Sequence, residues 1–147
     1  GWGTTDIASM EGMELIKYDG IDTAMLDAYL YAIEHLQGKY NELKQGMKTP
    51  FELDEIYRNN KKLKVRQREY DDFRDFINDA YKHTADEIVA TIKSLGYTFS
   101  DYDYVIFGGG GAYALRKYLP MDNHIKIIND AQIANARGFY IASKFMG

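Results

Sequence analysis

The chain has 147 residues, of which 46% are hydrophobic and 27% charged, the composition of an ordinary globular protein long enough to bury a core. Cysteine is absent, which excludes disulfides and thiol chemistry, and the three scattered histidines give no zinc-ligand spacing. No apolar run is as long as a membrane span and the first residues do not read as a signal peptide, so we expect a cytoplasmic protein without membrane contact.

The formal net charge is -4, and the cations are spread among the acids except in residues 59–68, which hold five cations. Glu69, Asp71 and Asp72 follow at once and cancel much of that field. This pattern favours a solvated hairpin or an interaction face over a nucleic-acid patch. We therefore expect no direct binding to nucleic acid.

The chain opens on a glycine turn, residues 1–6, that leads into two short strands, 7–11 and 13–18, around Gly12. Two such strands joined by a short glycine turn predict a β-hairpin. A tight glycine turn with no strand before it suggests that the natural start of the domain is missing. We therefore expect the chain to be a fragment.

Helical segments follow the hairpin. Apolar residues at helical spacing predict a helix capped by Asp22 that runs to about Leu43. Thr49, Pro50 and Glu52 mark the start of a short helix, with Thr49 as N-cap, proline at the first helical position and Glu52 completing a capping box.

The second half of the chain alternates strands and helices. The expected elements are a short strand or hairpin arm at 62–65, the longest helix at about 70–95 with Gly96 as its stop, a central strand at 101–107, a helix at 112–118 before Pro120, a strand at 124–128, and a helix from Ala131 to about Phe145 capped by Asn129-Asp130. This order indicates an α/β domain with a mixed sheet flanked by helices.

Two glycine-rich turns, one near each end of the chain, carry the candidate chemistry. The β-branched and aromatic strand at 104–107 stops in Gly108–Gly111, where a backbone without Cβ atoms can take positive φ and approach a ligand closely. Residues 1–6 offer backbone amides, two hydroxyls and a carboxylate, which suit phosphate oxygens and a hydrated magnesium ion. A plain hairpin entry is the alternative for this turn. Neither turn matches a P-loop or a dinucleotide fingerprint.

Three stretches of the sequence resemble motifs of one superfamily, and they occur along the chain in the same order as in that superfamily. Residues 1–6 resemble the second phosphate loop of the actin, Hsp70 and sugar-kinase superfamily, 105–112 its adenosine loop, and 130–140 its closing connecting helix. The last stretch, and the Thr49-Pro50 helix with its basic follow-on, are most similar to the ParM (StbA-type) actin-like ATPases that segregate plasmids. The resemblance covers essentially the whole chain as a second, C-terminal domain.

The resemblance implies a ribonuclease-H-like domain, with residues 1–20 and 96–147 as core subdomain and a mainly helical subdomain, 21–95, inserted between them. ATP and Mg²⁺ would lie in a cleft between this domain and a first one, and hydrolysis would proceed by a positioned water. The implied phosphate-binding residues are Gly1, Gly3, Thr4 and Thr5; Asp6 would hold magnesium through water; and Gly108, Gly109, Gly110, Gly111 and Ala112 would lie against the adenosine.

The sequence departs from the family pattern at the phosphate loop. The family carries an aspartate two residues before the first loop glycine, where this chain begins, and the first domain is absent. Half a cleft remains, so we expect the 147 residues to bind ATP weakly or not at all and not to hydrolyse it. Trp2 is bulky where the family often has a small residue, and we expect its ring to point away from the phosphates.

The leading functional hypothesis is the C-terminal half of an actin-like, ATP-dependent, filament-forming protein for plasmid or DNA segregation. Its implied partners are further copies of itself and a DNA-bound adaptor protein. One alternative is a metabolite kinase of the same superfamily, although no polar cluster for a sugar is evident between the hairpin and the central strand. Another is a non-catalytic, truncated interaction domain.

Overall fold

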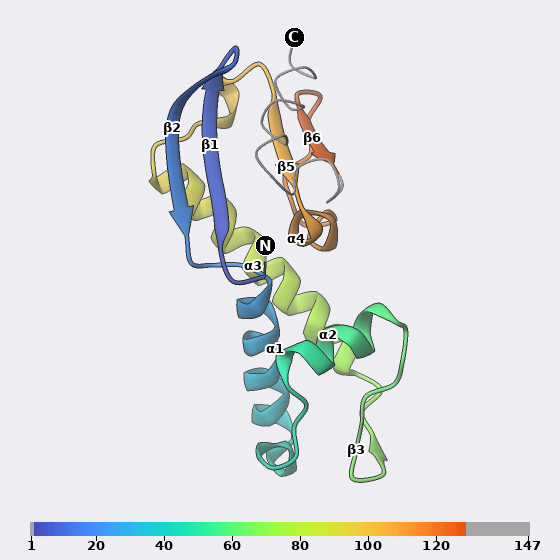
Figure 1. Cartoon of the computed structure of the whole chain (residues 1–147). Helices are drawn as coiled ribbons and strands as arrows, with labels where there is room; N and C mark the ends of the chain where they lie inside the picture. Colours follow the sequence, from blue (N-terminus) through green and yellow to red (C-terminus); the bar gives the residue numbers. More distant parts are fainter. Residues whose placement is uncertain (1, 129–147) are drawn as a thin grey trace.

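The computed structural model describes residues 2–128 and consists of two lobes that share one long helix, α3 (Figure 1). The elements are β1 (Thr5–Glu11), β2 (Glu14–Ile21), α1 (Met25–Lys39), a 3-10 turn (Asn41–Lys44), α2 (Pro50–Arg58), β3 (Lys64–Val65), β4 (Arg68–Glu69), α3 (Phe73–Ser94), a second 3-10 turn (Phe99–Asp101), β5 (Val105–Gly108), α4 (Gly110–Ala114) and β6 (Ile125–Ile128). We call β1, β2, β5, α4 and β6 the strand lobe, and α1, α2, β3 and β4 the helical lobe.

The strands pair two by two. β1 and β2 form the expected hairpin, antiparallel with Thr5 opposite Ile21 and with an irregularity between Ser9 and Met10, and Gly12 takes a φ of 61° in its turn. β5 and β6 are parallel, and β3 and β4 form a short antiparallel hairpin at the far end of the helical lobe. Among residues 2–128, the strands therefore form three separate two-stranded sheets, two of them antiparallel and one parallel.

Helix α3 supports both lobes. Its first turns pack with α1 and α2, and its last turns lie beside the β1–β2 hairpin (Figure 1). There the Lys17 ammonium on β2 donates to the Leu95 carbonyl, and the Tyr97 hydroxyl donates to Asp19 at 2.6 Å. The predicted division into a core subdomain and an insert at 21–95 stays a prediction.

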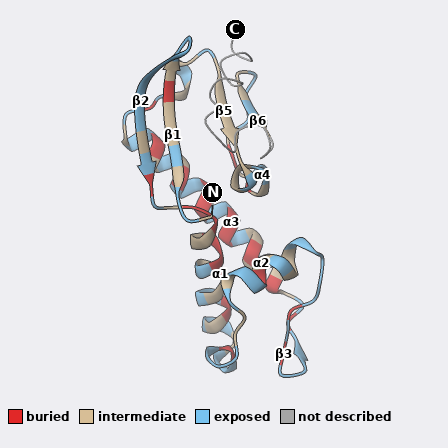
Figure 2. Ribbon diagram, viewed as in Figure 1, coloured by how far each residue is buried: buried red, intermediate tan, exposed pale blue. Residues whose placement is uncertain are grey.

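The densest part of the core lies in the helical lobe. Figure 2 shows the buried positions of α1, α2 and α3 facing one another. Six large apolar side chains are fully buried there: Tyr29, Leu36, Leu43, Leu53, Leu63 and Ile77. Helix α3 carries a buried apolar stripe, formed by Phe73, Ile77, Ala80, Tyr81, Ile88 and Ile92.

Two helix boundaries differ from the prediction. Helix α1 is not capped by Asp22: Ala24 is the N-cap, and its amide donates to the Asp27 carboxylate at 2.8 Å in the first turn. The helix ends at Lys39 rather than Leu43, because Tyr40 leaves helical geometry. Leu43 keeps its buried position from the following 3-10 turn, so apolar spacing alone placed the boundary too late.

The prediction that Thr49 is the N-cap of α2 is confirmed by its side-chain hydrogen bond. The Thr49 hydroxyl accepts from the Glu52 amide at 3.2 Å, and Pro50 opens the helix. The Glu52 carboxylate accepts from the Thr49 hydroxyl at 3.1 Å. That contact replaces the reach back to the Thr49 backbone that a full capping box requires.

The central strand and the helix after it are shorter than predicted. β5 begins at Val105 instead of residue 101, because residues 99–101 form a 3-10 turn. α4 spans Gly110–Ala114 instead of 112–118, and residues 115–118 form turns ahead of Pro120, where a helix would be disfavoured. The predicted helix at 131–145, the connecting motif at 130–140 and Gly1 lie outside the described residues.

Candidate functional site

The turn that precedes β1 is tied to the helical lobe by its backbone. The Leu26 amide, in the first turn of α1, donates to the Trp2 carbonyl at 2.8 Å. The Thr5 hydroxyl donates to the Thr23 carbonyl at 2.6 Å. Gly3 is exposed, and a Cβ added there would meet nothing within 4 Å. The turn is therefore fixed on one side and open on the other, which leaves room for a ligand above Gly3.

Asp6 lies next in the strand, on the face of the hairpin that carries Tyr18. Its carboxylate is exposed and accepts a hydrogen bond from the Tyr18 hydroxyl at 2.9 Å. This bond and the carboxylate's charge raise the pKa of Tyr18. A single exposed carboxylate fits a magnesium ion that takes its other ligands from phosphates and water.

The second turn follows β5. Gly108 is the last residue of the strand, and Gly109 takes a φ of 95° before α4 begins at Gly110. Of the four glycines, Gly109 takes the positive φ that the run allows, whereas Gly108, Gly110 and Gly111 have ordinary strand or helix geometry. The strand therefore reverses into the helix at one residue, where a side chain would be strained.

Both turns lie at the same end of the strand lobe. In Figure 1, β1 starts and β5 stops at the end that faces the helical lobe, because the two strands run in opposite directions there. Gly3, Thr4, Thr5 and Asp6 are thus found at the same end as Gly108–Ala112. A ligand in contact with both turns would lie at the junction of the two lobes.

Trp2 points into the helical lobe. Its ring stacks on Phe51 at 4.6 Å between centroids and on Tyr29 at 5.6 Å. Tyr29 is fully buried, and its hydroxyl bonds Asp54 at 2.7 Å. Burial and a hydrogen bond with Tyr81 raise the pKa of Tyr29. The sequence analysis did not identify Phe51 as the residue on which Trp2 stacks. The signal that could have shown it is the large aromatic side chain at the second position of α2, where a polar residue is expected at the surface.

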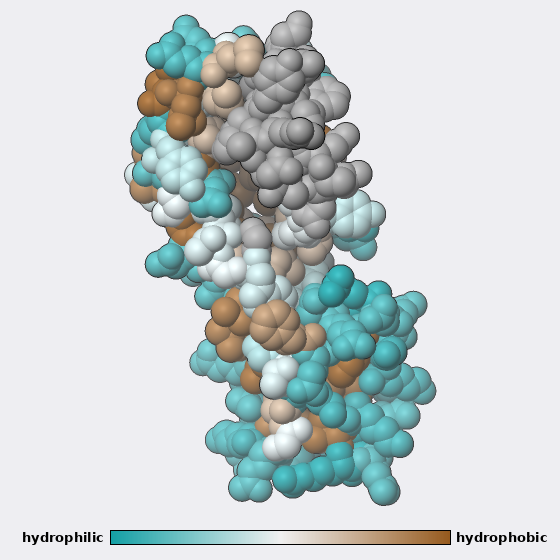
Figure 3. All heavy atoms as spheres, in the orientation of Figure 1, coloured by the Kyte–Doolittle hydropathy of each residue, from teal (hydrophilic) through white to brown (hydrophobic). Residues whose placement is uncertain are grey.

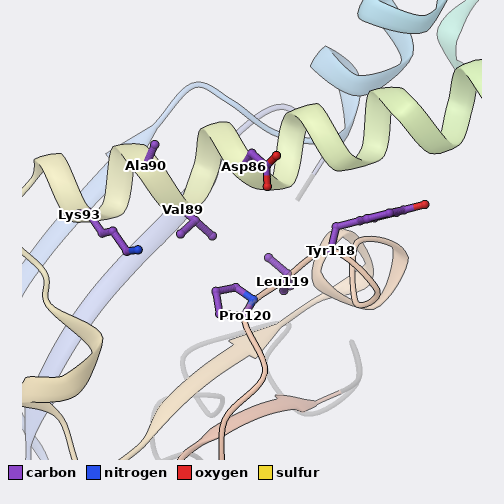
Figure 4. A pocket seen from close by; sticks show the side chains of 7 residues that line it. All are labelled: Asp86, Val89, Ala90, Lys93, Tyr118, Leu119 and Pro120. Carbon is purple, nitrogen blue, oxygen red and sulfur yellow. The ribbon is translucent and has the colours of Figure 1, made fainter.

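A shallow open pocket of about 360 Å³ lies elsewhere, between α3 and the segment after α4 (Figure 4). Its lining residues are Asp86, Val89, Ala90, Lys93, Tyr118, Leu119 and Pro120. None of the residues predicted from the glycine turns lines it. Its wall is largely apolar, with one acid and one base on α3.

Residues 2–128 contain no group of three or more acidic or histidine side chains arranged to hold a metal ion. The same range has no helix both long and apolar enough to cross a bilayer. Any metal at the glycine turns would therefore depend on Asp6 and on the ligand's own oxygens.

The structure combines an antiparallel hairpin that opens on a Gly-Thr-Thr-Asp turn, a parallel strand that ends in glycines, and a helical lobe beside them, in agreement with the actin-like domain that the resemblance implies. A family model of archaeal MreB-like actin homologues, C-terminal domain, matches residues 1–120. The chain belongs to this family of actin homologues, which confirms the resemblance to the actin-like superfamily.

A solved structure shows the same fold. The chain is similar to a pCBH ParM non-polymerisable quadruple mutant, with a TM-score of 0.70 and 18% sequence identity. The match covers 97% of this chain and 44% of that one, so the chain spans less than half the length of the ParM that it resembles. No curated protein matches the sequence. The predicted actin-like α/β fold is confirmed.

Proposed function

We propose that this chain is the C-terminal lobe of an actin-like, ATP-binding, filament-forming protein that segregates plasmid or other DNA in the cytoplasm. The observation that carries the proposal is the position of both glycine turns at the end of the strand lobe that faces the helical lobe. The match to a ParM whose mutant is described as non-polymerisable supports filament formation. A DNA-bound adaptor protein would link the filament to its cargo.

In this proposal the two turns bind opposite ends of ATP. The exposed Gly3-Thr4 backbone and the Thr5 hydroxyl would contact the β- and γ-phosphates, together with Gly1. Asp6 would hold Mg²⁺ through water, and the ion would neutralise phosphate charge. Gly108–Ala112 would lie against the adenosine, and the positive φ of Gly109 turns the strand into α4 at this point.

In this proposal the described residues would form one wall of such a cleft. The chain covers 44% of the ParM that it resembles, and we propose that a first lobe supplies the second wall and the groups that position the attacking water. The 147 residues alone would then bind ATP weakly and leave it intact. Nucleotide would act on the assembly by closing the cleft, because closure favours the state that polymerises.

Calorimetric titration of ATP, with and without Mg²⁺, tests this proposal. We expect micromolar binding and turnover only for a chain that also carries a first lobe. In that longer chain Asp6→Asn should abolish the gain in affinity that Mg²⁺ provides, whereas Gly109→Ala should weaken binding with or without the ion. Asp101→Asn, a matched acid outside both turns, should change neither.

Two outcomes would contradict separate parts of the proposal. Micromolar binding with turnover by the 147 residues alone would overturn the half-cleft interpretation. Absence of binding in both chains would overturn the nucleotide site itself.

A further inference from the structure

The single tryptophan of the chain, Trp2, opens the turn at residues 2–5, which we call the phosphate turn, and the helical lobe holds both its backbone and its ring. The Trp2 carbonyl accepts from the Leu26 amide at 2.8 Å, one of the first amides of α1, which have no partner within the helix. The ring lies against Tyr29, three residues further along α1. Residues three apart share one face of a helix, so Trp2 is fixed to a single face of α1 by two contacts of different kinds.

Tyr29 gives the indole a rigid support. It is fully buried, and its hydroxyl donates to Asp54 on α2 at 2.7 Å and shares a hydrogen bond with the Tyr81 hydroxyl on α3. The Asp54 carboxylate also accepts from Arg58 at 2.9 Å. Helices α1, α2 and α3 therefore all hold the ring on which Trp2 lies.

Phe51 covers the indole from α2 and is itself mostly exposed. Its ring centroid lies 4.6 Å from that of Trp2, with 20° between the ring planes, and the residue is 65% exposed. Figure 3 shows hydrophobic atoms at the surface over the start of α1 and α2. Among residues 2–128, the ring contact of Phe51 is with Trp2 alone. A side chain this exposed adds little to the core, so its contact with the indole is what distinguishes it.

The residue after Trp2 has no side chain with which to fix its own position. Gly3 is exposed, and a Cβ added there would meet nothing within 4 Å. At the other end of the turn, the Thr5 hydroxyl donates to the Thr23 carbonyl at 2.6 Å. Because a glycine backbone can adopt many conformations, the direction in which the Gly3 amide faces depends on how the residues beside it are held.

We propose that Trp2 is a positioning residue of the phosphate turn. Its ring, held by Phe51 and Tyr29, fixes the direction in which the backbone from Gly3 onward faces. A turn that is ordered before the ligand arrives loses less conformational entropy on binding. The inference rests on the proposed function for its ligand, a nucleoside triphosphate, and it assigns part of the affinity to aromatic side chains that face the helical lobe.

A stack that only packs the two lobes together is the alternative. Trp2 is half-buried and lies at the margin of the core, so its loss would lower stability under either interpretation. The mobility of the turn separates the two. Positioning predicts that Gly3 and Thr4 lose order in a protein that stays folded, whereas packing alone predicts a turn as ordered as before.

Nuclear magnetic resonance relaxation of the backbone amides in the 147-residue chain tests the positioning without nucleotide. Phe51→Ala removes the exposed cover of the indole and should leave the chain folded. We expect the order parameters of the Gly3 and Thr4 amides to fall from about 0.85, typical of rigid backbone, to below about 0.6. Phe51→Tyr keeps the ring and should keep the wild-type values. Met13→Ala, at an apolar residue that is 70% exposed in the β1–β2 turn, should change nothing at the phosphate turn.

Calorimetric titration of ATP then relates the order of the turn to binding. In a chain that also carries a first lobe, Phe51→Ala should weaken binding about tenfold, because ordering the backbone of one residue costs about this factor. Phe51→Tyr and Met13→Ala should bind ATP as the wild-type chain does. Unchanged order parameters in Phe51→Ala would overturn the positioning of the turn, and a mobile turn with unchanged affinity would overturn its role in binding. If no chain binds ATP, the nucleotide site fails, and the relaxation data still decide whether the stack orders the turn.

Discussion

The helical lobe and the strand lobe bury their apolar residues to different degrees. Among residues 2–128, the six large apolar side chains that are fully buried all belong to the helical lobe or to the part of α3 that packs on it. In the strand lobe, all four residues of β5 are only partly buried, and Leu15, Ile16 and Tyr18 on β2 are each 55% exposed. The helical lobe therefore has the denser core, although Leu30 and Phe51 on it are 49% and 65% exposed, and the strand lobe exposes a run of apolar residues on β2.

The two lobes are therefore stabilised in different ways. Large burial stabilises the helical lobe and the first half of α3 on their own, at about 25 cal/mol for each Å² of apolar surface. The strand lobe depends on α3 and a few polar contacts, such as those of Lys17 and Tyr97. Surfaces that bind ligands or neighbours are expected in the less stable part of a protein.

Truncation of one leucine in each lobe should give the largest contrast. We expect Leu36→Ala to lower the free energy of unfolding by about 2–5 kcal/mol, because it leaves a cavity in a fully buried site. Leu15→Ala should change it by less than about 0.5 kcal/mol, because the side chain is 55% exposed. Urea unfolding followed by circular dichroism measures both, and equal losses would show that the lobes are not built differently.

The stack of Trp2 on Phe51 and Tyr29 allows the connection between the lobes to be tested. Trp2→Ala should destabilise the chain by about 1–3 kcal/mol, less than a fully buried aromatic would, because Trp2 is only partly buried. Trp2→Phe keeps a ring in the stack and should recover most of that loss. Thermal unfolding of the three proteins gives the comparison, and a Trp2→Phe variant as unstable as Trp2→Ala would show that stacking is not what matters.

The sequence predicted the elements better than their ends. Apolar spacing and the Thr49-Pro50 signature placed α3, α2 and the first hairpin, because these depend on neighbours in the chain. The end of α1 was wrong, since Leu43 is buried whether its backbone is α-helical or 3-10. The spacing of apolar residues indicates which side chains are buried, but more than one backbone conformation can bury the same side chain.

The sequence predicted which residues make up the candidate site, but not the side-chain contacts that these residues form. Glycine residues mark both turns in the sequence, with threonine and aspartate at the first, and the lack of a Cβ is what allows the positive φ of Gly109. The stacking of Trp2 on Phe51 and the hydrogen bond of Asp6 with Tyr18 depend on how separate elements approach one another. Such contacts between distant residues leave no periodic signal in a single sequence.

The smallest expected effect concerns Asp72, just before α3, and its dependence on pH. Burial alone would raise the pKa of Asp72, but hydrogen bonds from Lys39 and Tyr40 outweigh it and hold the pKa below its ordinary value of 3.8. A carboxyl whose pKa is lower in the folded state stabilises that state above its unfolded pKa, and this contribution is lost as the pH falls through the folded pKa. The effect should be small, because one carboxylate oxygen, Oδ1, is buried without a hydrogen-bond partner among residues 2–128.

Asp72→Asn should therefore unfold more easily than the wild-type protein at pH 7, by less than Trp2→Ala does, and the difference should disappear as the pH falls from 3.8 through the lower folded pKa of Asp72. Urea midpoints measured between pH 7 and pH 2.5 provide the comparison. Asp71→Asn, at an exposed neighbouring position, serves as the control and should leave the midpoints nearly unchanged at every pH. A difference between Asp72→Asn and wild type that persisted at pH 2.5 would mean that the carboxylate's charge is not what stabilises the junction of α1 and α3.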